Sequence, residues 1–386
     1  MADSSPASSS GAPPASSERP ASTETPPLKA FEVVRACLSS RPAAARRDTV
    51  RSLVGAGLDW DTVRREAARH RVLPLFDRRV EALLGEECPE SVRKNGRKHR
   101  RGVRIRNAFL ADELGRVVDA FQEADLPVLA HKGPVLSKAV FGDVAARHSV
   151  DMDVVIPRAR AREADRLLRG LGYEHAAKRA ALEGWRKTLS LYLDGQWEFT
   201  RGASFMLDLH TRIMPPGYTF PRAPRSFWER SEPVALRDDV TVPGFAPEDR
   251  VLVLSHHGVK NQWRILRHVV DIAGALRAPS ALDWSRLRTR ARKQRATRAT
   301  QLGLFLAHDL LEVPLPAPIR GWIDIPPVRR VGAQMAAHLR RRHETDALGY
   351  RDRVRLQLAT KDTVAGQLRY GAHSLLHHLW DSVLRP

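Results

Sequence analysis

The run Arg147-His-Ser-Val-Asp151-Met-Asp153-Val-Val-Ile-Pro157 places two carboxylates two residues apart at the head of an apolar strand. The valines and the isoleucine that follow Asp153 are residue types that favour a strand. Because strand side chains alternate between the two faces of a sheet, Asp151 and Asp153 are expected to share one face. Two hard oxygen ligands on one rigid face suit Mg²⁺ that is bound together with a substrate phosphate. The stretch therefore predicts a magnesium site and indicates nucleotide chemistry.

A later apolar stretch, Phe205-Met-Leu-Asp208-Leu-His210, carries a third acid. Alternation places His210 on the same strand face as Asp208. Three acids on neighbouring strands can hold two metal ions about 4 Å apart, with Asp151 and Asp153 bridging the ions. Asp208 would complete the metal at an attacking hydroxyl and help draw off its proton. The alternative is that Asp208 is an ordinary edge-strand residue that faces water.

The segment Pro127-Val-Leu-Ala-His-Lys-Gly133 predicts a short strand and a glycine turn, and Pro134 then suits the first position of a helix. Backbone amides at a helix N-terminus can hold a phosphate, and Gly133 permits close approach of the ligand. Lys132 is expected to pair with a triphosphate. An ordinary turn with a surface lysine is the alternative.

Changes of sequence pattern divide the 386 residues into four parts. Residues 1–27 are rich in Ser, Ala, Pro and Thr and predict a disordered tail, whereas residues 28–125 have apolar residues at helical spacing. Short strands alternate with helices over residues 126–215 and predict a small mixed sheet. Residues 216–386 predict a proline-punctuated connection, up to residue 245, and then helices. The predicted fold class is therefore α+β, a small mixed sheet flanked by N-terminal and C-terminal helical regions.

The chain carries a formal net charge of +20, and most of its 64 basic residues are arginine. Such a charge favours a polyanionic partner such as tRNA or another nucleic acid. A general arginine bias is the alternative, because the charge is spread over nearly every segment. Residues 93–106 are the exception, since Arg and Lys gather there on one helix-like stretch that either holds phosphates or forms a solvated helix face.

Two cysteines, Cys37 and Cys88, are too few and too far apart for a zinc knuckle or a disulfide framework, which fits a reducing cytosol. No apolar run approaches the ~20 residues needed to span a bilayer. Residues 1–27 also lack the basic start and apolar core of a secretory signal. We therefore expect a cytoplasmic protein with no membrane partner.

Five blocks occur in a characteristic order between residues 130 and 275. They are Lys132-Gly133, Arg147 with Asp151-x-Asp153, Leu171-Gly172-Tyr173, Leu207-Asp208-Leu209-His210, and a helical stretch that contains His256-His257-Gly258, Lys260, Trp263 and Asp271. This arrangement resembles the uncharacterised nucleotidyltransferase family of the polymerase-beta-like superfamily. The resemblance implies a nucleotidyltransferase core embraced by helices, two Mg²⁺ ions and an NTP such as ATP as the donor.

The resemblance also implies site residues outside the three acids. Lys132, Gly133 and Arg147 are expected to contact the nucleotide, and Lys260 is expected to be a second phosphate contact. Trp263 and Leu266 are expected to lie in the core. Several of the other residues at helical spacing in this block are expected to face the cleft from the C-terminal unit.

The function predicted from the sequence is Mg²⁺-dependent transfer of a nucleoside monophosphate from an NTP to a hydroxyl group. The acceptor is left open between a small molecule, a peptide, a protein and tRNA. One alternative is a nucleic-acid-binding protein whose core has lost turnover and whose basic stretch at residues 93–106 makes the contacts. Another is a toxin-like transferase that modifies tRNA or a protein.

Overall fold

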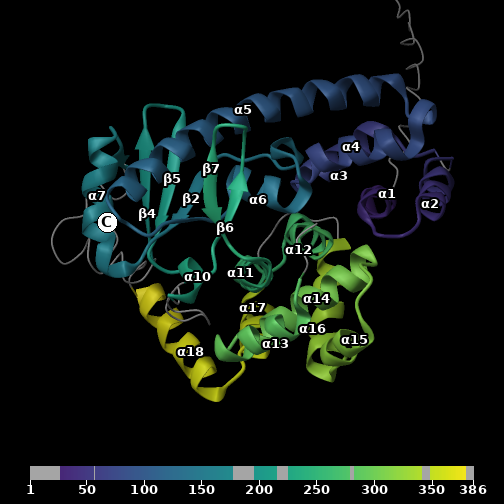
Figure 1. The fold of residues 1–386 in the computed structure, drawn as a ribbon. Helices are drawn as coiled ribbons and strands as arrows, with labels where there is room; N and C mark the ends of the chain where they lie inside the picture. The colour runs from purple at the N-terminus through teal and green to yellow at the C-terminus, as the bar shows by residue number, and fades with distance from the viewer. Residues whose placement is uncertain are drawn as a thin grey trace, which may run out of the picture.

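The computed structural model describes residues 27–55, 57–176, 195–214, 225–278, 282–340 and 348–379. The predicted tail lies outside these residues except for Pro27, which begins the first helix. Five helices make up the N-terminal region: α1 (Pro27–Leu38), α2 (Ala43–Gly55), α3 (Trp60–Arg69), α4 (Leu73–Leu84) and α5 (Glu90–Glu123). The long helix α5 runs from the small N-terminal helices to the sheet and contacts α4 near one end and α7 near the other (Figure 1). It thereby ties the two regions together.

Seven strands form one mixed sheet in the order β3-β4-β5-β2-β1-β7-β6. They are β1 (Leu129–Ala130), β2 (Met152–Val155), β3 (Glu174–His175), β4 (Gln196–Arg201), β5 (Phe205–His210), β6 (Glu232–Ala235) and β7 (Thr241–Gly244). Among the residues that the structure describes, the helices α6 (Gly133–Phe141), α7 (Ala161–Gly170) and α10 (Ser226–Glu229) accompany them. The α+β class is therefore confirmed. In Figure 1, α5 runs along one side of the sheet and the C-terminal helices lie on the opposite side, whereas α1 to α4 lie at the far end of α5, and α1 contacts the C-terminal helix α14.

The sheet extends beyond residue 215, where the sequence analysis expected it to end. Part of the expected connection over residues 216–245 forms β6 and β7, and β7 pairs in parallel with β1. Pro233 and Pro243 argued against strands because proline cannot donate to a ladder. The two prolines lie opposite each other in the register of β6 and β7. Opposite residues of an antiparallel pair alternate between positions that exchange hydrogen bonds and positions that do not. Two opposing prolines cost no ladder hydrogen bond at a position of the second kind.

Alternation along β2 and β5 separates apolar from polar side chains. Met152, Val154 and Leu207 are buried in a core with the C-terminal half of α5 and with α7. Asp153 and Asp208 therefore point to the other face of the sheet, because strand side chains alternate. The apolar residues fix the register that brings the two acids together, since a slip by one residue would expose this core.

In the described part of the C-terminal region, the helices that follow the sheet are α11 (Pro247–Lys260), α12 (Arg267–Arg277), α13 (Trp284–Lys293), α14 (Thr297–Leu311), α15 (Ala317–Ile323), α16 (Pro326–Arg340), α17 (Tyr350–Ala359) and α18 (Val364–Leu379). Helix α12 packs directly on α6. The contact requires Gly274, because a Cβ atom there would lie 2.3 Å from a methyl group of Val140. This packing brings the N-terminal end of α12 beside the acid-bearing face of the sheet. Among the described residues, no helix has the length and apolar character needed to cross a membrane.

Candidate active site

The central pair of the site is Asp153 on β2 and Asp208 on β5. The two strands are parallel and the two residues are direct partners in the register. One ligand atom each from Asp153, Asp208 and His210 can be chosen so that all three lie within 4.8 Å of one another. Asp153 is buried with 3% of its surface exposed, whereas Asp208 is half-buried. Such spacing suits a shared cation, because carboxylate oxygens are the preferred ligands of hard divalent ions.

Lys132 and His210 hold the carboxylate of Asp153 in place. Lys132 Nζ and His210 Nε2 lie 2.8 and 2.9 Å from the same oxygen, Asp153 Oδ1. Burial lowers the pKa of His210, so the ring is neutral near pH 7 and donates this hydrogen bond from Nε2. His210 therefore orients Asp153, and it shares the strand face with Asp208 as alternation predicted.

The pKa values of the three acids are shifted in different directions. Burial alone would raise the pKa of Asp153, but the Lys132 ammonium and the hydrogen bond from His210 hold it well below its ordinary value. Burial, and then the negative charge of Asp153, raise the pKa of Asp151. Burial and the two neighbouring acids raise the pKa of Asp208 to about 7. Additional positive charge is therefore needed before all three acids are ionised at neutral pH.

The glycine turn lies directly against the strand that carries the acids. Gly133 has a φ of +58°, and a Cβ atom there would lie 3.0 Å from the carbonyl oxygen of Asp151. Both observations require glycine, because an L side chain is strained in this conformation. Helix α6 begins at Gly133, and Pro134 occupies its first turn. The sequence therefore predicted the glycine turn, and the helix begins one residue before Pro134, its predicted first position.

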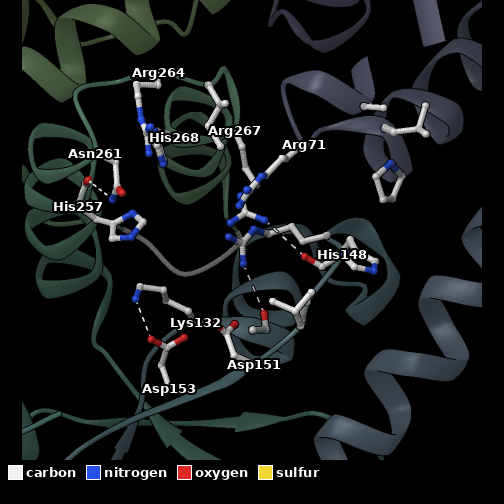
Figure 2. A pocket seen from close by; sticks show the side chains of 18 of the residues that line it. Arg71, Lys132, His148, Asp151, Asp153, His257, Asn261, Arg264, Arg267 and His268 are labelled. Carbon is white, nitrogen blue, oxygen red and sulfur yellow. Dashed lines mark hydrogen bonds and ion pairs between the residues drawn. The ribbon is translucent and has the colours of Figure 1, made fainter. Parts of the chain in front are cut away.

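A cavity of about 650 Å³ opens in front of these residues. Asp151, Asp153, Asp208, Lys132 and Gly133 line one side of it. The side chains of the opposite wall come from α11, the turn after it and the start of α12, and Figure 2 shows them across from Lys132 and the acids. These residues are His257, Asn261, Arg264, Arg267 and His268. The predicted contribution of the C-terminal block to the cleft thus has a counterpart in the cavity wall.

Arg147 lines the cavity, but its guanidinium group is engaged elsewhere. Its Nε and Nη2 atoms lie 2.8 and 3.0 Å from the two carboxylate oxygens of Asp271 on α12, and both residues are buried. A third contact runs from Arg147 Nη1 to the carbonyl oxygen of Gly133, at 3.4 Å. Arg147 therefore connects α12 with the glycine turn. A direct contact of Arg147 with a nucleotide stays a prediction.

Helix α5 fixes the segment that precedes β2. Asn107 donates from Nδ2 to the carbonyl oxygen of Arg147 at 2.7 Å and accepts from the backbone N–H of Ser149 at 3.3 Å. Ser137 Oγ accepts the backbone N–H of Arg147 at 3.1 Å. With its backbone held by α5 and α6, the run into Asp151 has little freedom to move.

The remaining residues of the C-terminal block have different places. Trp263 and Leu266 are fully buried, which confirms their assignment to the core. Gly258 lies under the Trp263 ring, where a Cβ atom would meet the ring at 2.4 Å. Lys260 is not among the residues that line the cavity. Burial is the main cause of the lowered pKa of His257, and the charge of Lys260 is one of the smaller causes. The role predicted for Lys260 as a phosphate contact stays a prediction.

The basic stretch at residues 93–106 lies on α5, and part of its charge is compensated. Arg97 and Arg100 pair with Glu81 at 2.7 and 2.8 Å, and Arg104 lies 3.6 Å from Asp143. Arg101 is exposed. Ion pairs of this kind are common on a solvated helix face. Binding of nucleic acid by this stretch stays a prediction.

Sequence reasoning did not single out Arg71 and His148, which also line the cavity. Arg71 follows α3 in the N-terminal helical region, far from the motifs in the chain. In a chain with so many arginines, no local pattern distinguishes this one. The quoted block does contain Arg267, but helical spacing alone did not separate it from its neighbours.

Comparison with known proteins agrees with this geometry. Residues 56–312 match the sequence profile of a family described as "Uncharacterised nucleotidyltransferase", and the chain belongs to this family. It is thus a nucleotidyltransferase. No curated protein matches the sequence significantly.

Among the solved structures that are similar to part of the chain is that of the antibiotic-resistance factor ANT(2'')-Ia in solution. The match has 18% sequence identity and a TM-score of 0.35, and it covers 49% of this chain and 94% of the other. A TM-score this low supports no statement about the present chain.

Proposed function

We propose that the protein transfers a nucleoside monophosphate from an NTP to a hydroxyl group of an acceptor, with two Mg²⁺ ions held by Asp151, Asp153 and Asp208. The observation that carries this proposal is the register of β2 and β5, which sets Asp153 directly beside Asp208 on the cavity wall. A buried carboxylate beside a half-buried one is costly to ionise unless enough positive charge accompanies both, and Lys132 supplies only one such charge.

The donor set fits Mg²⁺ because its oxygens are supplied by carboxylates. The raised pKa values of Asp151 and Asp208 support the same conclusion, since they express an unmet need for positive charge. When bound, the ions would neutralise charge on the phosphates and on the departing pyrophosphate. His210 is better suited to orient Asp153 than to bind Mg²⁺, because imidazole is not a preferred ligand of this ion.

The proposed roles of the chain follow from these positions. Lys132 and the turn at Gly133 bind the triphosphate, with the amides of the first turn of α6 as donors. Asp208 accepts the proton of the acceptor hydroxyl. The hydroxyl oxygen then forms a bond to the α-phosphorus as the bond from that phosphorus to the bridging oxygen breaks. The products are the nucleotidylated acceptor and pyrophosphate, and Asp208 later releases the proton to solvent.

The experiment is to incubate the full-length protein with each α-labelled NTP and Mg²⁺, with and without candidate hydroxyl acceptors. Labelling of an acceptor or of the protein, or release of pyrophosphate, is expected for the wild type. Asp153→Asn should abolish the signal, and Asp208→Asn should lower the rate by about 10²–10⁴, as for loss of a general base.

The matched control is Asp119→Asn, which makes the same change at an exposed position on α5. Its rate should equal that of the wild type. Equal rates for Asp153→Asn and the wild type would refute the proposal. The acceptor found in this way would decide between a small molecule, a peptide, a protein and tRNA.

A further inference from the structure

Two arginines from distant parts of the chain meet at the cavity. Arg71 follows α3 and Arg267 begins α12, and both line the cavity. Figure 2 shows their end groups pointing toward one another, across the cavity from Lys132 and Asp153. Arg71 adopts a φ of +56°, which a residue with a side chain rarely does. This left-handed conformation is a common way to end a helix, and here it follows α3, where the N–H groups of Arg71 and Val72 donate to the carbonyl oxygens of Ala68 and Ala67.

Neither arginine has a carboxylate at ion-pair distance among the residues that the structure describes. Arg267 donates from Nη1 to the carbonyl oxygen of His148 at 3.4 Å, while its Nε atom is buried without a hydrogen-bond partner. Asp271 is nearby, but both of its oxygens face Arg147. The cluster therefore holds more positive than negative charge.

This excess charge affects the groups around it. Burial, and then the charge of Arg147, lower the pKa of Arg267 to about 10, and Arg71 adds to the shift. Burial and then Arg267 lower the pKa of His268 well below its ordinary value. Like charges brought together in a partly dry cavity repel each other. A bound anion would relieve this repulsion, and a planar guanidinium group suits the oxygens of a phosphate.

We propose that Arg71 and Arg267 form a subsite for the terminal phosphates of the donor and hold the pyrophosphate as it leaves. This inference rests on the proposed function. It assigns a binding role to the N-terminal helical region, because Arg71 comes from there. The donor site is then completed by three parts of the chain: the glycine turn, the start of α12 and Arg71, the second residue after α3.

The position of the two arginines favours the leaving group over the acceptor. Arg267 contacts the backbone of His148. Arg147, the residue before His148, contacts the backbone of Gly133. The arginine pair thus adjoins the glycine turn that is proposed to bind the triphosphate. In phosphoryl transfer the attacking and departing oxygens lie roughly in line on opposite sides of phosphorus. The acceptor hydroxyl, whose proton goes to Asp208, would then lie on the other side.

The test measures binding of inorganic pyrophosphate by calorimetry to the full-length protein, with and without Mg²⁺ and in the absence of donor and acceptor. The variants are Arg71→Gln, Arg267→Gln and the double variant. We expect each single change to weaken pyrophosphate binding by about tenfold, which corresponds to ~1.4 kcal/mol. Arg330→Gln, which removes the same charge from an exposed position on α16, should bind like the wild type. Unchanged binding in both single variants would overturn the proposal.

A second measurement separates the donor from the acceptor. The ratio of NTP to NMP affinity should fall about tenfold in the variants while NMP affinity stays the same, because NMP lacks the terminal phosphates. Binding of inorganic phosphate is also measured to protein saturated with a non-hydrolysable NTP. If the variants keep the NTP affinity of the wild type but lose this phosphate binding, the arginines contact an anion of the acceptor, and the proposal is overturned.

Folding and turnover are checked separately. Removal of Arg267 relieves repulsion, so the variant should unfold at the same temperature as the wild type or higher, and pyrophosphate should raise the unfolding temperature of the wild type alone. A lower unfolding temperature of both single variants would show that the arginines stabilise the fold and would count against the proposal. Arginine-dependent pyrophosphate binding in a protein that transfers no nucleotide would refute the proposed function and leave the anion subsite standing.

Discussion

The ammonium group of Lys132 lies 2.8 Å from Asp153 Oδ1, so an internal cation already faces the carboxylate proposed to hold Mg²⁺. Lys132 is the residue before α6, and Asp153 lies in the middle of β2. The pair therefore joins the glycine turn to the acid-bearing strand. It also means that a metal ion and Lys132 act on the same carboxylate. Lys132 is then expected to turn toward the triphosphate when metal and nucleotide bind.

The first prediction concerns Lys132→Met in the protein without metal. The change leaves a buried carboxylate with only the hydrogen bond from His210, and loss of one partner of such a pair costs up to about 3–5 kcal/mol. Lys132 is partly exposed, with 21% of its side-chain surface accessible, so we expect the lower end of this range. Thermal unfolding should show a lower unfolding temperature than for the wild type.

Mg²⁺ provides the contrast for this variant. It should raise the unfolding temperature of Lys132→Met more than that of the wild type, because the ion replaces the missing positive charge. Lys138→Met, a change of the same kind near the other end of α6, should behave like the wild type with and without Mg²⁺. An equal response of all three proteins to Mg²⁺ would contradict this account of the pair.

The second prediction concerns the turn that faces Asp151. Gly133→Ala introduces a side chain at a φ of +58° and a Cβ atom 3.0 Å from the Asp151 carbonyl oxygen. Strain of this kind costs about 1–3 kcal/mol. We expect a lower free energy of unfolding and weaker NTP binding, since the turn must move away from β2.

The chain contains a matched control for the glycine turn. Gly142, which ends α6, has a φ of +71°, but a Cβ atom there would meet nothing within 4 Å. Gly142→Ala should therefore lose stability through backbone strain alone and keep the NTP affinity of the wild type. If both variants bind NTP equally well, the close approach of Gly133 to β2 has no role in nucleotide binding.

The third prediction concerns the buried ion pair between Arg147 and Asp271. Asp271→Asn leaves the Arg147 guanidinium without its charged partner and should lower the free energy of unfolding by about 3–5 kcal/mol. The double variant Arg147→Met/Asp271→Leu replaces the pair with apolar side chains and should recover most of that loss. Chemical denaturation measures both. A double variant as unstable as the sum of its single changes would show that the pair is needed for more than charge balance.

The acids of the site can be predicted from the sequence, whereas the arginine pair of the cavity cannot. Asp151, Asp153 and Asp208 could be found from local patterns, because Asp153 and Asp208 interrupt apolar runs and Asp151, which the structure places just before β2, precedes Asp153 by two residues. Gly133 could be found for the same reason, since a strand, a glycine and a proline follow one another. The strand register that brings Asp153 to Asp208 depends on tertiary packing, but the apolar residues between the acids already restrict it.

Other features required the structure because they depend on contacts between distant segments. The pairing of Arg147 with Asp271 joins residues 124 positions apart, and nothing in either segment indicates the other. The strands β6 and β7 were missed because their prolines are typical of loops, whereas the opposing positions of Pro233 and Pro243 make them compatible with a sheet. Arg71 reaches the cavity because the end of α3 contacts the start of α12, where the backbone N–H of Arg267 donates to the carbonyl oxygen of His70 at 3.3 Å.

The fourth prediction concerns acid sensitivity and His256. This residue of α11 is buried, and its Nδ1 atom lies 3.0 Å from the carbonyl oxygen of Leu252. Burial lowers its pKa from 6.5 to about 3. Below pH 6.5 the unfolded chain therefore binds a proton at this residue that the folded protein does not. By linkage, this proton uptake by the unfolded chain lowers the free energy of unfolding as the pH falls below 6.5. The loss is about 1.4 kcal/mol at pH 5.5.

His256→Leu should reduce this acid dependence. The free energy of unfolding, measured by chemical denaturation, should fall between pH 7.5 and pH 5.5 by about 1.4 kcal/mol less in the variant than in the wild type, because one titrating group has been removed. The comparison is made within each protein across pH, so any change in packing caused by leucine cancels. Equal losses in the two proteins would mean that His256 takes up its proton in the folded state, in conflict with the burial of its side chain.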